Sequence, residues 1–298
     1  MVKEIVLALG GGGVRGVAHL GVVQCLLDNH YKINAIAGTS AGGLFGAVIA
    51  AKVDPREISD VVDEFFKHSS FKANLASGPL SLISTDGLEK TLAPYLKGKK
   101  IEDLPIPFVA TAVSLKNGEE VVLRQGDVMK AVMTTIAIPG FFPSQGESIL
   151  VDGGVLDPVP VEPARSLNSR LPIVAVVLNK RPADFHLAET KVPLEDSFFE
   201  PIVNVVSRTR FGELLRHLSI TVDVVNKQMS DLRLELSKPD VLVEPIVGHF
   251  SLLQKVESKE LFDEGYRAMQ ANLPALEKSY SIINSFNRIR KYSRKKEE

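Results

Sequence analysis

Apolar and polar positions along the chain follow two patterns, one typical of buried strands and one typical of helices. Residues 5–9 are continuously apolar, as in a strand buried on both faces of a sheet. From Val17 to Leu27, apolar residues instead recur at helical spacing. The same two patterns predict strands at 34–37, 149–151, 172–178 and near 240–246, and helices at 41–51, from 54 onward, and at 128–138, 198–230 and 257–292.

One short turn sequence predicts an antiparallel element. Asn117-Gly118 separates the β-rich runs 109–115 and 119–124, which is typical of a hairpin. Elsewhere strand and helix patterns alternate, so we expect an α/β fold with a mainly parallel sheet and helices on both faces. Gly and Pro clusters fall between elements without a break in composition. We therefore expect a single domain over 1–298.

Composition narrows the class of protein. The 298 residues are 45% hydrophobic and 24% charged, with a formal net charge of −1, which is the balance of a soluble globular protein. A chain this close to neutral lacks the overall basic charge of a nucleic-acid-binding protein. Cys25 is the one cysteine, which excludes an intramolecular disulfide and a zinc site built on thiolates. We predict no metal and no cofactor.

Two apolar segments bear on location. The apolar stretch before the first glycine run is too short for a secretory signal, so we expect a cytoplasmic protein. Residues 33–51 carry no charge until Lys52 and approach the length of a membrane span. However, Gly38, Gly42, Gly43 and Gly46 interrupt this segment, which favours a buried strand, a tight turn and a small-residue helix.

The first motif is Gly11-x-Gly13-x-x-Gly16, which follows the first predicted strand and opens a helix. The spacing is compatible with dinucleotide binding, but that site also needs an acidic residue about 20 positions later. No Asp or Glu occurs from 33 to 53, and no Lys-Ser/Thr pair follows the glycines as in a P-loop. The motif alone therefore indicates only backbone N–H groups that can stabilise negative charge.

The second motif, Gly38-x-Ser40-x-Gly42, fits the nucleophile elbow. It lies between a predicted strand and a predicted helix, the context that this motif requires. The alternative is a glycine-rich turn in which the serine caps the helix. With both flanks in place, we favour Ser40 as a nucleophile.

A serine nucleophile needs a base, and the sequence offers two candidates. His249 is the only histidine placed like the late histidine of a Ser-Asp-His order. Asp152 ends a predicted buried strand and enters Gly153-Gly154, at a sheet edge where α/β proteins bind ligands. A carboxylate with a pKa near ~4 is a poor base for serine, so this pair requires an enclosed site and a short hydrogen bond.

The glycine run 10–16, the elbow and Asp152-Gly153-Gly154, in this order, resemble the patatin-like phospholipases. The similarity covers about 5–180 and is greatest to compact bacterial members akin to the catalytic part of neuropathy target esterase, with a helical part at about 198–292 beyond it. The resemblance implies a three-layer α/β/α sandwich and a Ser-Asp dyad without histidine. By position it implies Ser40 as nucleophile, Asp152 as base, the N–H groups of Gly12 and Gly13 as the oxyanion hole, and supporting roles for Gly11, Arg15, Gly16, Gly38, Gly42, Gly153 and Gly154.

The resemblance leads us to expect a serine lipid acyl hydrolase acting on a fatty-acyl ester, with transient contact at a membrane surface. We expect Arg15 to anchor its loop rather than bind an anionic head group. An apolar lining for the acyl chain could come from 69–84, 141–143 and Phe198-Phe199, although such residues are more often ordinary core. The basic tail at 288–296 could touch anionic lipid, but a solvated terminus is commoner.

Two other classes stay open at this point. One is an acyltransferase or thioesterase of another α/β class, which would need a working histidine such as His249. The other is a non-catalytic protein that binds a nucleotide or a lipid.

Overall fold

The fold is built on one mixed β-sheet. The structure, a computed structural model, describes residues 2–68, 85–139, 142, 144, 149–179, 210–250 and 256–281. In these residues a seven-stranded sheet has the order β4-β3-β2-β1-β6-β7, with β5 also paired to β3. The strands are β1 (Lys3–Leu9), β2 (Tyr31–Thr39), β3 (Phe108–Ser114), β4 (Glu119–Leu123), β5 (Leu150–Asp152), β6 (Ile173–Val176) and β7 (Val241–Val243).

Strand direction explains why distant motifs meet at one edge of the sheet. β1 runs parallel to β2 and β6, β2 runs parallel to β3, and β6 runs parallel to β7. Leu9 at the end of β1 pairs with Gly38, so the glycine run and the elbow leave the sheet side by side. β4 and β5 are both antiparallel to β3, and Asp152 pairs with Ala112. The predicted mainly parallel sheet and the predicted hairpin are confirmed.

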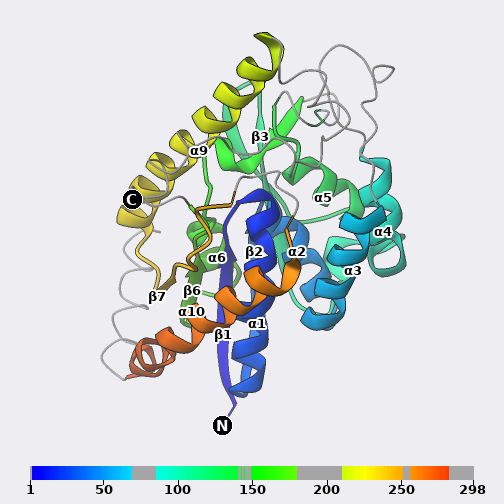
Figure 1. The fold of residues 1–298 in the computed structure, drawn as a ribbon. Coiled ribbons are helices and arrows are strands. Elements are labelled where there is room, and N and C mark those ends of the chain that lie inside the picture. Colours follow the sequence, from blue (N-terminus) through cyan, green and yellow to red (C-terminus); the bar gives the residue numbers. More distant parts are fainter. Residues whose placement is uncertain are drawn as a thin grey trace.

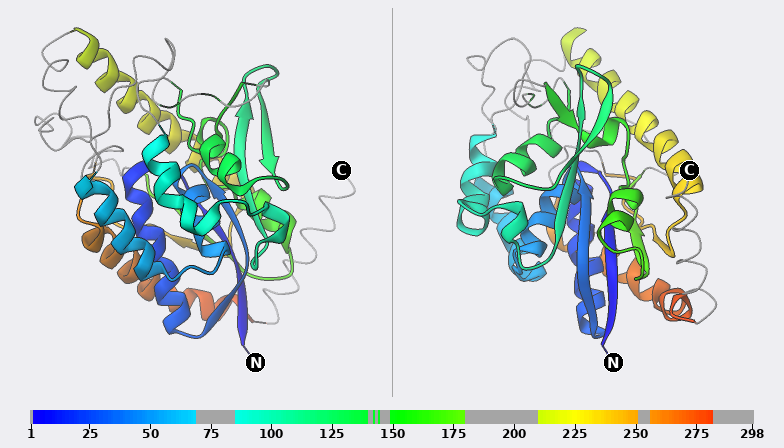
Figure 2. Two further views of the ribbon diagram at one scale, coloured as in Figure 1. Left: turned by 90° about the vertical axis from the view of Figure 1, so that its right-hand side faces the viewer. Right: turned by 180° about the vertical axis from the view of Figure 1, so that it is seen from behind.

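Helices cover both faces of the sheet, as Figures 1 and 2 show. Ile5, Leu7 and Leu9 of β1 point into a core formed with α1, α2, α3, α4, α5 and α10, whereas Val6 and Ala8 point into a second core that includes α6. This alternation along a strand makes the three layers. The helices are α1 (Ala18–Asp28), α2 (Ala41–Ala50), α3 (Pro55–His68), α4 (Asp86–Leu96), α5 (Val128–Thr135), α6 (Val161–Leu167), α9 (Arg210–Ser237) and α10 (Ser258–Ser279), with 3₁₀ helices η1 (Gly13–Val17), η2 (Ile101–Asp103) and η3 (Gly153–Val155).

The observed elements extend and trim the predicted ones. β2 begins at Tyr31 rather than 34, because Tyr31 and Ile33 are buried while Lys32 between them is exposed. α4 and α6 have no counterpart among the predicted helices. α9 continues to Ser237, beyond the predicted end at 230. Residues 69–84, 198–209 and 282–292 lie outside the described part of the chain.

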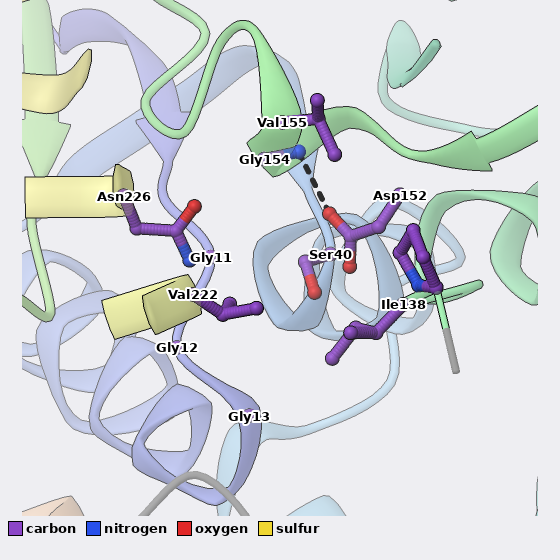
Figure 3. Close-up of a pocket in the computed structure, with 11 residues that line it drawn as sticks. Gly11, Gly12, Gly13, Ser40, Ile138, Asp152, Gly154, Val155, Val222 and Asn226 are labelled. Atoms are coloured by element: carbon purple, nitrogen blue, oxygen red, sulfur yellow. Dashed lines mark hydrogen bonds between the residues drawn. The ribbon is translucent and has the colours of Figure 1, made fainter. Parts of the chain in front are cut away.

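The two long C-terminal helices pack differently. α10 lies against α1 at very close range, since a Cβ at Gly265 would come within 1.9 Å of the Ala18 carbonyl oxygen. α9 runs diagonally past the upper end of the sheet in Figure 1, and Figure 3 shows that it reaches the pocket described below. Across the described ranges, no helix combines the length and the apolar character needed to cross a bilayer.

Candidate active site

Ser40 occupies the tight turn between β2 and α2. Its backbone has φ 54° and ψ −123°, a left-handed conformation that is costly for a residue with a side chain. Gly38 and Gly42 make this turn possible, because a Cβ at Gly38 would lie 2.2 Å from the Gly42 carbonyl and one at Gly42 would lie 2.0 Å from that of Leu9. The elbow geometry expected from the sequence is therefore present, and the capping alternative is not, since the Ser40 side chain makes no cap hydrogen bond to α2.

Threonines brace the elbow, and the sequence did not indicate them. The Ser40 N–H donates to Thr135 Oγ1 at 2.9 Å, and that hydroxyl donates to the Thr111 carbonyl at 2.7 Å. Thr39 Oγ1 donates to the Asp157 carbonyl at 2.8 Å. These bonds bind the strained turn to β3, to α5 and to the loop after β5, so the surrounding structure holds Ser40 in its conformation.

Asp152 ends β5 and faces Ser40 across the pocket. Its carboxylate is 5% exposed, and Oδ1 accepts the Gly154 N–H at 2.7 Å. Figure 3 shows the Ser40 hydroxyl beside the second carboxylate oxygen. Oδ2 has no partner in hydrogen-bonding geometry among the described residues. One oxygen thus fixes the side chain, and the other is directed at the serine.

The surroundings of Asp152 make its carboxylate more basic. Burial raises the pKa of Asp152 to about 6, and two groups that favour the anion, the nearby Ser40 hydroxyl and the hydrogen-bonded Gly154 N–H, offset only part of that rise. A base of this strength is still mainly ionised at neutral pH and accepts a proton more readily than an ordinary aspartate. Of the two features that a Ser-Asp pair requires, the enclosed site is present, whereas a short hydrogen bond from Ser40 to Oδ2 is not formed in this structure.

The glycine loop after β1 presents two free N–H groups at the same pocket. The Gly11 N–H is already used, since it donates to the Pro158 carbonyl at 2.9 Å. Gly12 and Gly13 donate no hydrogen bond within the described residues, and both line the pocket beside Ser40. Gly13 has φ 58°, which only glycine adopts readily. Within the described residues, Gly12 and Gly13, rather than Gly11, therefore keep unused N–H groups in the loop that lines the pocket.

Arg15 is buried beneath this loop. The side chain is 2% exposed and does not line the pocket. Nε donates to the Gly12 carbonyl at 3.1 Å, and Nη2 contacts Asp223 Oδ1 at 2.6 Å. This placement agrees with the expected anchoring role and leaves no surface on which Arg15 could meet a head group.

The other motif glycines serve close packing. A Cβ at Gly16 would lie 2.6 Å from that of Ala41, and a Cβ at Gly153 would lie 2.2 Å from Thr111 Oγ1. Gly16 lets η1 press against α2, and Gly153 lets the turn after Asp152 press against β3. A Cβ at Gly154 would lie 3.0 Å from Asp152 Oδ1, so this residue is itself part of the carboxylate's surroundings.

No described histidine lines the pocket. His19 is fully buried, its Nε2 donates to the Gly10 carbonyl at 2.8 Å, and burial lowers its pKa to about 4. His19 is therefore a neutral support for the glycine loop. His249 is exposed, its ring lies in a tilted contact 4.1 Å from that of Phe250, and it does not line the pocket that holds Ser40. His186 lies outside the described residues.

The pocket itself is small, with about 420 Å³ of empty space including its open mouth. Ile138, Val155 and Val222 supply apolar walls, and Asn226 adds a polar group. Val222 and Asn226 come from α9, which no motif had connected to the site. The described residues contain no cluster of His, Cys, Asp and Glu able to hold a metal ion. The expected acyl lining at 69–84, Phe141, Pro143 and Phe198-Phe199, and the basic tail, lie outside the described residues.

Sequence comparison agrees with this geometry. The profile of the family described as "Patatin-like phospholipase" matches residues 7–165, more than half of the chain, and this range holds the glycine loop, Ser40 and Asp152. The chain belongs to the patatin-like phospholipase family. The resemblance found in the motifs is confirmed, and so is the α/β class with its mainly parallel sheet.

The relatives of this patatin-like chain include proteins that carry the name NTE. An uncharacterized NTE family protein of Mycobacterium tuberculosis is 35% identical over 180 residues, which cover 59% of this chain and 49% of the relative. Lysophospholipase NTE1 of Cryptococcus neoformans is 32% identical over 181 residues, covering 59% of this chain and 11% of that protein. The chain thus aligns with half or less of each relative. Among solved structures, VipD of Legionella pneumophila aligns with 92% of this chain and 67% of its own at 14% identity, with a TM-score of 0.48.

Proposed function

We propose that this patatin-like chain is a serine lipid acyl hydrolase with Ser40 as nucleophile and Asp152 as general base. One observation carries the proposal: a strained, buried serine faces a buried carboxylate whose second oxygen has no other hydrogen-bond partner in the described structure. Membership of the family supports a reaction on lipids. The Ser-Asp pair supports acyl transfer as the chemistry.

In the first half of the reaction, the proton of Ser40 passes to Asp152 Oδ2 while Oγ attacks the carbonyl carbon of the ester. Negative charge develops on the carbonyl oxygen, and the N–H groups of Gly12 and Gly13 stabilise it. These donors are backbone groups in a buried loop, so they need little reorganisation as the charge appears. Asp152 then gives its proton to the departing alcohol oxygen, and an acyl-serine remains.

In the second half, water replaces the alcohol. Asp152 takes a proton from the water, whose oxygen attacks the acyl carbonyl, and the same two N–H groups stabilise the second oxyanion. When the intermediate collapses, the proton returns to Ser40 Oγ and the fatty acid leaves. Asp152 serves as base and acid in turn, so the described dyad needs no histidine for this cycle.

The substrate we propose is a carboxylic ester of a lipid, and a lysophospholipid is the first compound to test. The apolar side chains of Ile138, Val155 and Val222, which line the pocket, suit an acyl chain. The name of the Cryptococcus relative, lysophospholipase, supports the same choice. A cytoplasmic location with transient contact at a membrane surface stays part of the proposal.

The two competing functions make different demands on the site. An acyltransferase or thioesterase with a catalytic histidine would place an imidazole beside Ser40, where the described structure places Asp152. A passive binder would have no reason to hold Ser40 in a left-handed backbone conformation. We therefore favour the hydrolase over both.

The test is hydrolysis of a lysophospholipid and of a p-nitrophenyl acyl ester by the wild type, Ser40→Ala and Ser59→Ala. Ser59 is a matched control, because it is also buried but bonds to Ser258 far from the pocket. We expect Ser40→Ala to lose at least ~10³-fold in kcat and Ser59→Ala to stay near the wild type. Equal activity of Ser40→Ala and the wild type would refute the proposal.

A further inference from the structure

α9 reaches the active site although it lies outside the part of the chain that matches the family profile. Val222 and Asn226 line the pocket, and Asp223 between them is buried at 5% exposure. Its Oδ1 lies 2.6 Å from Arg15 Nη2. A contact between a helix at residue 223 and the loop at residue 15 joins two distant parts of the chain. This contact has no role in the reaction as written above.

Arg15 controls the direction of one peptide group in the oxyanion loop. Both its backbone N–H and its Nε donate to the Gly12 carbonyl, at 3.2 Å and 3.1 Å. The Gly12 carbonyl and the Gly13 N–H belong to the same peptide unit, which is planar and trans. When Arg15 holds that carbonyl on its own side, the Gly13 N–H must point the opposite way, which is away from Arg15.

The backbone of the loop holds this peptide group by one hydrogen bond only, from the Arg15 N–H to the Gly12 carbonyl. The unit is flanked by two glycines, whose backbone angles are the least restricted of any residue. A rotation of the unit would turn the carbonyl oxygen toward the pocket and the N–H away from it. The second bond to this carbonyl, from Arg15 Nε, opposes that rotation only while the guanidinium stays in place, and Asp223 holds the guanidinium of this 2%-exposed side chain.

We infer that Asp223 is a positioning residue for the oxyanion hole, acting through Arg15 on the Gly12–Gly13 peptide. This inference rests on the proposed function and extends it, because it makes α9 part of the catalytic unit. It also explains why a full positive charge is buried under a loop that needs no charge of its own. The Arg15 guanidinium holds the uncharged Gly13 N–H in the orientation that the reaction needs.

The experiment measures kcat and KM for a p-nitrophenyl acyl ester in three variants. Asp223→Asn keeps the shape of the side chain and removes its charge. Asp231→Asn is the matched control, because Asp231 lies on the same helix but is exposed and pairs with Lys227. We expect Asp223→Asn to lower kcat about 10- to 100-fold with KM changed less than about threefold, since an oxyanion donor acts mainly on the transition state. Asp231→Asn should match the wild type.

A third variant separates positioning from simple loss of stability. Arg15→Met with Asp223→Leu removes both buried charges together, a change that often leaves a protein as stable as before. We expect its unfolding midpoint to return toward the wild-type value while kcat stays at least about tenfold low. Hydrogen exchange should also show faster exchange at 12–16 in Asp223→Asn than in Asp231→Asn.

The outcomes are distinguishable. Recovery of kcat together with stability in the double variant would show that Asp223 is merely structural and overturn the inference. Wild-type kcat in folded Asp223→Asn would do the same, and in both cases the Ser40→Ala result would still uphold the hydrolase. If the wild type does not hydrolyse esters and Ser40→Ala has the same activity as the wild type, the proposed hydrolase function is overturned, and this inference with it.

Discussion

Two regions of the molecule bury an aspartate to the same extent and use it in opposite ways. At the end of β5, Asp152 is 5% exposed, lacks a cationic partner in the described structure and has a raised pKa. In the middle of α9, Asp223 is also 5% exposed but forms an ion pair with Arg15. Burial without a cation leaves Asp152 with the raised pKa that the proposed base requires, whereas burial beside Arg15 gives Asp223 an ion pair. The different partners of the two carboxylates, at equal burial, are the basis of the different roles that we propose for them.

The largest effect should come from removing the base. Asp152→Asn keeps the side-chain shape and its bond to Gly154 but cannot accept the serine proton. We expect kcat for ester hydrolysis to fall about 10³- to 10⁴-fold, in the upper range for loss of general-base catalysis. The double variant Ser40→Ala/Asp152→Asn should have a kcat no lower than that of the less active single variant, because the two residues act as a unit.

Asp157→Asn is the control for this substitution. Asp157 is buried in the same loop, and burial raises its pKa to about 7, yet its side chain does not line the pocket. We expect its kcat to remain within a few-fold of the wild type. A loss as large as that of Asp152→Asn would mean that any charge change in this loop disables the enzyme, and the comparison would fail.

The same Asp→Asn change should alter stability in opposite directions at the two sites. At Asp152 the folded-state pKa is about 6, above the ordinary value of 3.8, so the unfolded chain ionises first and stability falls as pH rises from about 4 to about 6. The Asp152→Asn substitution removes that penalty and should stabilise the fold by about 2–3 kcal/mol at pH 8 and by almost nothing at pH 4. At Asp223 the change leaves Arg15 buried without its counter-charge and should cost about 3 kcal/mol or more.

Urea unfolding at pH 8, followed by circular dichroism, gives both free energies on one scale. Repeating the Asp152→Asn measurement at pH 4 supplies the internal control. Two variants that are destabilised alike would show that the two carboxylates do not differ in the way proposed.

A smaller effect is expected in the pH dependence of wild-type kcat/KM. Only the carboxylate form of Asp152 accepts the serine proton, so kcat/KM should fall about tenfold for each pH unit below about 6 and level off above it. Asp223 contacts Arg15 and does not line the pocket, so Asp223→Asn should lower the plateau without moving the midpoint by more than a few tenths. A midpoint near 4 would show that Asp152 is an ordinary, solvated aspartate.

The smallest effect should follow His249→Ala. His249 is exposed and absent from the pocket, so we expect kcat and KM to stay within about twofold of the wild type. A loss of turnover would favour the histidine-dependent acyltransferase or thioesterase and would remove Asp152 from its proposed role. Steady-state kinetics on the same p-nitrophenyl ester checks this directly.

Much of the fold and the centre of the candidate site could be predicted from the sequence. The glycine run, the elbow and Asp152-Gly153-Gly154 are local patterns in which small residues mark where the backbone must turn or approach closely. The strands could be predicted because buried parallel strands are continuously apolar, as in β1. These signals lie in adjacent residues, so they can be recognised from the sequence alone.

The contribution of α9 could not be predicted in the same way. The helical region was expected, but Asp223 and Asn226 are ordinary polar residues on a long helix, where the default is a solvated face. Their role depends on how α9 docks, which brings Asp223 to Arg15, 208 positions earlier in the chain. A weak signal was present: Asp223, Ser230 and Ser237 recur every seven residues and are all buried, so α9 turns a polar stripe inward. No rule of hydrophobic patterning identifies such a stripe.

The most direct test of the Ser40–Asp152 pair is covalent labelling. A fluorophosphonate reacts far faster with an activated serine than with an ordinary one, and mass spectrometry identifies the labelled peptide. We predict a single label on Ser40 in the wild type, none in Ser40→Ala, and labelling of Asp152→Asn slowed by at least ~10²-fold. Labelling of Asp152→Asn at the wild-type rate, or a label on any other residue, would contradict the account.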